Sequence, residues 1–190
     1  MLLCGGGRIR DLSVKQSKGI YCSTEELIAH DSVIEEVPKL EVVIEVPRGS
    51  FLKRGSTGHL DFVSPFPCPF NYGSVEAYVG LDGDLLDAVV LGPRLRRGTR
   101  VTVQALGAVG LMDRGMYDDK IICGTHPLGP YQRFFVLLFF RVYAKCKGLL
   151  NFIRGRPGPN HCQGWFEARA AISRASSRKD VLWNGPVIPF

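Results

Sequence analysis

The chain has 190 residues, of which 45% are apolar and 22% are charged. This composition excludes bulk disorder and is typical of one folded domain with a sizeable core. The net charge of +6 permits contact with polyanions. The arginine clusters at 94–100 and 154–156 each contain a glycine and have a proline next to them, so we interpret them as solvated loops. They lack an aromatic platform for bases, and we therefore disfavour a nucleic-acid-binding barrel.

The N-terminal residues 1–39 have weak periodicity and a glycine triplet at 5–7. The triplet follows no strand pattern and matches no phosphate-loop motif. We therefore predict an extension that the sequence does not assign to a regular structure, followed by one domain at 40–178 and a tail at 179–190.

A β-branched run from Val42 to Val46 predicts the first strand, which Pro47 and Gly49 end. Helical periodicity appears only later, at 131–150 and 165–176. Together these features predict an α+β fold, a small antiparallel, OB-like β-barrel with helices packed on it, the main ones C-terminal. Further short strands are predicted at 59–63, 75–79, 86–91, 100–106 and 119–123.

The most apolar stretch is Phe134–Phe140, which Arg141 and Lys145 interrupt. It is far shorter than the ~20 residues that a membrane span needs, so we expect no membrane contact and predict a buried helix.

The six cysteines form no C-x-x-C pair and no zinc-ligand spacing. Reduced thiols fit this pattern, and we expect a cytoplasmic protein.

A cluster of carboxylates lies at Asp82-Gly83-Asp84-Leu85-Leu86-Asp87 and continues at Asp113 and Asp118. Acidic groups at this density repel one another unless a cation lies between them, and oxygen ligands favour magnesium, manganese or calcium over zinc. An EF-hand loop is excluded, because its glycine would fall on Asp87 and its final glutamate on Pro93. A polar hairpin turn at Asp82-Gly83 is the purely structural alternative.

The D-G-D-x-x-D segment with a downstream D-x-x-x-x-D-x-K resembles the soluble (family I) inorganic pyrophosphatases over residues 41–175. The other matching positions stand in the same order along the chain. They are Val43–Pro47, Lys53, Asn71-Tyr72-Gly73, Lys120, Tyr143 and Gly164-Trp165.

The resemblance implies hydrolysis of pyrophosphate to two phosphates by a water that divalent ions activate. Its cofactor would be Mg²⁺, with Mn²⁺ as an alternative, bound by Asp82, Asp87, Asp113 and Asp118. Asp84 resembles the general base, because its place between two ligands lets it accept the proton of the attacking water. Glu45 resembles a carboxylate that supports the ligands from behind.

The resemblance also implies that Lys53, Tyr72, Lys120 and Tyr143 bind the phosphate oxygens and that the chain forms a homo-oligomer. Without the family, an exposed lysine and a core tyrosine are the ordinary interpretations of Lys53 and Tyr143. Pyrophosphate is thus the expected small-molecule partner.

Five positions depart from the family pattern, and all would lie around the site: Gly55, Ser64, Cys68, Arg114 and Ala144. Arg114 reverses a charge, so it would repel an outer cation or itself bind a phosphate. Lys145 stands one residue beyond the usual lysine, but one residue turns a helical side chain by about 100°. A catalytically weak paralogue that binds a phosphate-containing ligand or regulates a partner is therefore the alternative function.

Overall fold

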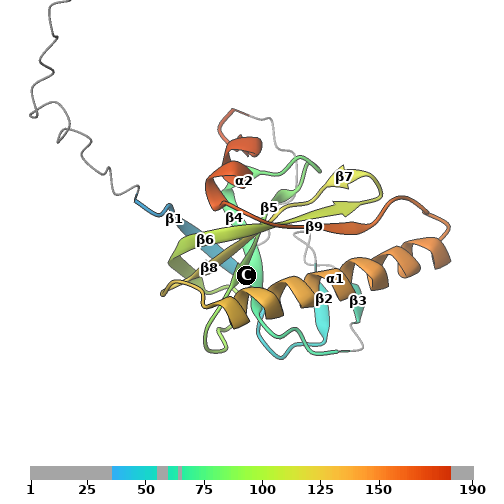
Figure 1. Ribbon diagram of the computed structural model, residues 1–190, viewed down its shortest axis with the longest axis horizontal. Helices are drawn as coiled ribbons and strands as arrows, with labels where there is room; N and C mark the ends of the chain where they lie inside the picture. The colour runs from blue at the N-terminus through green and yellow to red at the C-terminus, as the bar shows by residue number, and fades with distance from the viewer. Residues whose placement is uncertain (1–35, 55–59, 64–65, 181–190) are drawn as a thin grey trace, which may run out of the picture. The chain divides into compact units, whose positions relative to one another are not determined.

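The computed structural model describes residues 36–54, 60–63 and 66–180 (Figure 1). Most of the predicted extension at 1–39 and of the predicted tail at 179–190 lies outside these residues, as do Gly55 and Ser64. The strands are β1 (Lys39–Val46), β2 (Leu52–Arg54), β3 (Leu60–Val63), β4 (Asn71–Val79), β5 (Leu85–Val90), β6 (Arg100–Asp113), β7 (Met116–Tyr117), β8 (Lys120–Gly124), β9 (His161–Phe166) and β10 (Ser176–Ser177), and the helices are α1 (Pro130–Ile153) and α2 (Ala168–Arg174).

Five strands close into a barrel in the order β1-β4-β5-β8-β6, and β1 pairs again with β6 to complete the ring. The predicted α+β barrel is confirmed. One pairing differs from the antiparallel prediction, because β5 and β8 run parallel. The long connection through β6 and the β7 hairpin returns the chain in the same direction, and this is what places the start of β8 beside β5.

Alternate residues of the barrel strands contribute to two cores, as the two-residue period of a strand requires. Ala88 and Val90 belong to a cluster that draws on all five barrel strands and on α2. Val89, between them, belongs to a second cluster that includes residues of α1. Figure 1 shows the two helices on different sides of the strands. The barrel is thus packed on both surfaces.

Helix α1 begins at Pro130, where the missing N–H of proline costs nothing, and Gln132 Oε1 accepts a hydrogen bond from the Gly129 N–H at 3.0 Å. The predicted helix at 134–140 is confirmed, but its predicted burial is wrong. Phe134 is 61% and Phe135 53% exposed, whereas the buried residues recur at about one per turn, at Val136, Phe140, Ala144 and Asn151. The helix packs one stripe on the barrel.

Within the described ranges, no helix combines the length and the apolarity that a membrane crossing requires.

The predicted helix at 165–176 is wrong at its start. Trp165 and Phe166 belong to β9, where Trp165 pairs with Val109 of β6, and the helix begins only at Ala168. A Cβ on Gly107 would overlap the Trp165 indole, so the absence of a side chain there admits the ring. Pairing with β6 thus overrides the local helical periodicity.

The glycine of the Asn-Tyr-Gly motif permits a close approach of β1 to β4. A Cβ on Gly73 would overlap the main-chain carbonyl of Val43, which cannot move without breaking the barrel. We therefore expect Gly73→Ala to lower the free energy of unfolding by about 1–3 kcal/mol, as overpacking does. Urea denaturation would measure this loss. Gly129→Ala is the control, because its Cβ meets only Gln132 Oε1 at 3.7 Å, and an equal loss in both variants would contradict the explanation.

Candidate active site

The parallel pairing of β5 and β8 creates the centre of the site. It places Asp87 directly opposite Lys120, and Asp118 lies two residues before that lysine. The Lys120 ammonium donates hydrogen bonds to Asp87 Oδ2 and to Asp118 Oδ1, and only 1% of its side chain is exposed. Three of the residues that the sequence singled out therefore form one buried ion network.

The pKa values of this network follow from its burial and its charges. Burial disfavours the charged ammonium of Lys120, but Asp118 and Asp87 outweigh it, so the pKa of Lys120 is raised. Tyr72 donates its hydroxyl to Asp87 Oδ2. Burial, followed by the charges of Asp87 and Asp118, raises the pKa of Tyr72 well above its ordinary value. Tyr72 is therefore a neutral donor and Lys120 a fixed positive charge at neutral pH.

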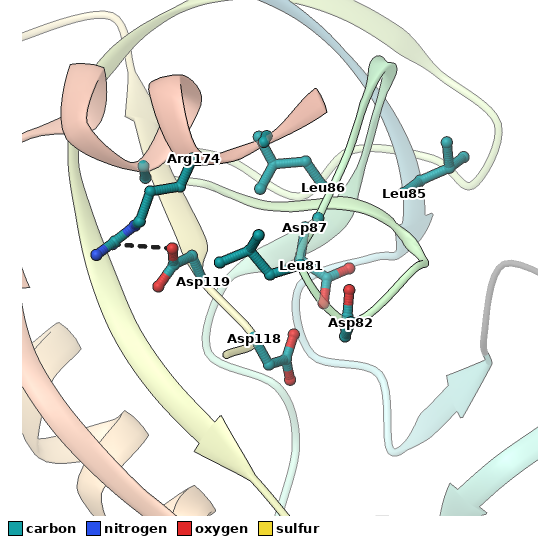
Figure 2. Close-up of a pocket in the computed structure, with 11 residues that line it drawn as sticks. Leu81, Asp82, Leu85, Leu86, Asp87, Asp118, Asp119 and Arg174 are labelled. Atoms are coloured by element: carbon teal, nitrogen blue, oxygen red, sulfur yellow. Dashed lines mark ion pairs between the residues drawn. The ribbon is translucent and has the colours of Figure 1, made fainter. Parts of the chain in front are cut away.

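Asp82 joins this group from the loop between β4 and β5. Together with Asp87 and Asp118 it lines a narrow pocket with about 10 Å³ of space, roughly that of one water molecule. Figure 2 shows the three carboxylates gathered at this pocket. Burial and the negative charge of Asp118 raise the pKa of Asp82 to about 6. The pocket thus carries an excess of negative charge that a bound cation would relieve.

A fourth carboxylate on the pocket wall has a different partner. Asp119 forms an ion pair with Arg174 of α2 at 2.9 Å, and Figure 2 shows it directed away from the other three. Its Oδ1 is buried without a hydrogen-bond partner, and burial raises the pKa of the group despite the arginine. Asp119 therefore ties α2 to the barrel.

The donor chemistry of Asp82, Asp87 and Asp118 fits a hard divalent ion, because all their donors are oxygen and the pocket matches one small ion. Across the part of the chain that the structure describes, no three acidic, histidine or cysteine side chains already stand at coordinating distance of one point. The Lys120 ammonium is the cation between two of these carboxylates. Binding of a metal ion here would require this lysine to give up part of its contacts.

Asp113, the remaining predicted ligand, stands just before a two-residue hairpin turn. Arg114 and Gly115 both have positive φ, 52° and 89°, which is the geometry of a type I′ turn between β6 and β7. Glycine at position 115 suits the positive φ that this turn requires. Asp113 precedes it, and the Arg114 Nε lies 3.9 Å from Asp113 Oδ1.

Helix α1 contributes a stripe of residues spaced by four, Tyr143, Lys147 and Asn151, to the same side of the barrel. Lys147 Nζ lies 2.8 Å from Asp113 Oδ2, and Asn151 Nδ2 donates to Asp113 Oδ1 at 2.9 Å. Sequence reasoning missed Lys147 and Asn151. Their spacing of one and two helical turns from Tyr143 is the signal that would have found them.

The two residues after Tyr143 do not reach this group. Ala144, at the position of the usual lysine, is buried in the core between α1 and the barrel. Lys145 is exposed, about 200° around the helix from Tyr143. The structure therefore brings Lys147, and not Lys145, to the site carboxylates.

Asp84, Glu45 and Lys53 are the other residues that the sequence predicted for the site. Asp84 is exposed on the loop, where its N–H donates to Asp82 Oδ1 at 3.2 Å. Glu45 is buried and accepts a hydrogen bond at 2.7 Å from Ser74, the residue paired with Asp87 across the sheet. The Lys53 side chain is outside the described part of the structure.

The Asn-Tyr-Gly motif also has a structural role. Asn71 is fully buried, and its side-chain amide donates to Val90 and Pro93 carbonyls and accepts the Arg48 and Leu95 N–H groups. These bonds fix the strand that presents Tyr72.

Cys68, where the family pattern has a tyrosine, lines a mainly apolar cavity of about 60 Å³ with Tyr72 and Tyr143.

Comparison with protein families gives one match, to the family described as inorganic pyrophosphatase, over residues 42–133. The inorganic pyrophosphatase of Streptomyces coelicolor is 30% identical over 125 residues, which are 55% of this chain and 77% of that protein. That of Haemophilus influenzae is 34% identical over 92 residues, 44% of this chain and 52% of that protein. The chain thus matches only about half the length of some of these relatives.

Solved structures agree with the fold. An inorganic pyrophosphatase from Thermus thermophilus superposes with a TM-score of 0.58 at 25% identity, over 72% of this chain and 86% of that one. A second, from Coxiella burnetii, has a TM-score of 0.58 at 22% identity and covers 74% of this chain and 92% of that one. This second likeness concerns the fold alone.

Proposed function

Because the chain belongs to the inorganic pyrophosphatase family, we propose that it hydrolyses inorganic pyrophosphate to two phosphates with the help of Mg²⁺. The observation that carries the proposal is the convergence of Asp82, Asp87 and Asp118 on one ion-sized pocket beside Lys120. A site for pyrophosphate needs acidic groups for metal ions next to cationic groups for phosphate. This site combines both.

Asp82, Asp87 and Asp118 are the residues that would hold the ion, with Mn²⁺ as an alternative to Mg²⁺. When bound, the ion supplies positive charge that stabilises the charge developing on the phosphates and lowers the pKa of a water. On substrate binding the Tyr72 hydroxyl would turn from Asp87 to a phosphate oxygen, Tyr143 would donate a second neutral hydrogen bond, and Lys120 would supply a fixed charge.

Asp84 is the proposed general base. Its carboxylate accepts a proton from the attacking water as the water oxygen bonds to one phosphorus, and the bond from that phosphorus to the bridging oxygen breaks. The second phosphate leaves with the bridging oxygen. Exposure of Asp84 on the loop, beside pocket-lining Asp82, suits a group that exchanges protons with solvent.

Phosphate release from pyrophosphate tests the proposal. We expect turnover with Mg²⁺ that disappears when a chelator removes the ion and returns when excess Mg²⁺ is added. The matched control is the Asp87→Asn variant, which should be inactive under the same conditions because it loses a ligand charge. A folded protein with no turnover above the chelated blank would overturn the proposed activity and would favour a role in binding phosphate-containing ligands.

A further inference from the structure

The carboxylate of Asp113 is surrounded by groups of its own chain. Lys147 Nζ lies 2.8 Å from its Oδ2, Asn151 donates to its Oδ1 at 2.9 Å, and the Arg114 Nε lies 3.9 Å from the same oxygen. Lys147 also approaches Asp118 Oδ2 at 3.7 Å. One ammonium thus stands between two carboxylates that the sequence predicted as metal ligands.

The contacts of Lys147 with the two carboxylates are partly shielded from bulk water. The Lys147 side chain is 23% exposed, that of Asp113 15% and that of Asp118 10%. Ion pairs at this depth are screened less by solvent than surface pairs, so they persist at ordinary salt concentrations. Asn151, which is itself buried, fixes the orientation of the Asp113 carboxylate.

We propose that the Lys147 ammonium is a built-in cation that occupies the outer cation position at Asp113 in place of a metal ion. An ammonium at 2.8 Å from a carboxylate oxygen neutralises the same charge as an ion bound there and blocks the oxygen from coordinating one. Arg114 adds a second positive charge on the other side of Asp113. The chain therefore supplies the positive charge at Asp113 from its own side chains.

The geometry also relates Lys147 to the substrate side of the site. Its Nζ lies 5.9 Å from the centre of the Tyr143 ring, one helical turn earlier. A fixed ammonium at this place would offset phosphate charge without an ion being recruited. This consequence for catalysis rests on the proposed function. The number of metal ions that the chain binds can be measured whether or not the chain hydrolyses pyrophosphate.

The test is to count bound Mn²⁺ by equilibrium dialysis with the full chain and the metal alone. We expect Lys147→Gln to bind one more Mn²⁺ per chain than the unaltered protein, because Asp113 loses its resident cation. Lys147→Arg should keep the original count. An unchanged count in a folded Lys147→Gln variant would overturn the proposal.

Two further variants keep the test decisive. Lys145→Gln removes a lysine of the same helix that faces solvent, and we expect the original count. Asp113→Asn should also keep the original count in the otherwise unaltered chain, because Lys147 and not a metal ion occupies this carboxylate. Loss of one ion in Asp113→Asn would refute the built-in cation even if Lys147→Gln fails to fold. Phosphate release, measured separately, shows whether the proposed activity itself holds.

Discussion

Replacement of Asp84 by asparagine is expected to lower turnover of pyrophosphate by about 10²–10⁴-fold, the usual contribution of a positioned general base. An amide has nearly the volume of the carboxylate but cannot accept the proton of the attacking water. Because Asp84 is exposed on its loop and does not line the ion-sized pocket, Mn²⁺ affinity should change by less than about threefold.

Asp82→Asn is the matched control, since it makes the same chemical change two residues earlier but within the pocket. This variant should lose Mn²⁺ affinity and turnover together, because its carboxylate is one of the proposed ligands. Steady-state phosphate release and Mn²⁺ dialysis on both variants separate the two roles. Turnover within threefold of the unaltered protein in Asp84→Asn would exclude Asp84 as the base.

Replacement of Lys120 by methionine should have the largest effect on stability. The ammonium is buried between Asp87 and Asp118, and its removal leaves two neighbouring carboxylates without their shared partner. Breaking a buried ion pair in this way costs about 3–5 kcal/mol of the free energy of unfolding. Urea denaturation at pH 7 without divalent ions would measure this loss.

Added Mg²⁺ provides a second measurement on the same variant. Because a divalent ion would take the place of the ammonium, millimolar Mg²⁺ should stabilise Lys120→Met more than it stabilises the unaltered protein. Lys39→Met is the control, since Lys39 pairs with Glu36 at the surface with 59% of its side chain exposed, and its loss should stay below about 1 kcal/mol. Equal losses in the two lysine variants would contradict the buried network.

Much of the site can be read from the sequence because its signals are local. The D-G-D-x-x-D segment, the Asp113–Asp118 spacing and the Asn-Tyr-Gly motif depend on residue types at fixed separations, and they indicated the family. Strand β1 and the turn at Gly115 follow from β-branched residues and from the backbone freedom of glycine. The α+β barrel follows from the order of these elements.

Long-range packing decided what the sequence left open. Trp165 lies in a strand because β6 offers it a partner and Gly107 offers it space, although its own neighbours favour a helix. Helix α1 leaves Phe134 and Phe135 exposed, because only one stripe of a helix can contact a barrel. Hydrophobicity along the chain does not tell which stripe this is.

The clearest case is the cation beside Asp113. The sequence offered Lys145, one residue beyond the family's lysine position at Ala144, and the helical rotation of about 100° per residue already spoke against it as a direct replacement. Tertiary structure decided for Lys147. The packing of Ala144 in the core fixes the rotation of α1, and this rotation directs Lys147, one full turn after Tyr143, toward Asp113. Rotation of a helix about its axis is set by the surface on which it packs, and neighbouring residues in the sequence do not contain that information.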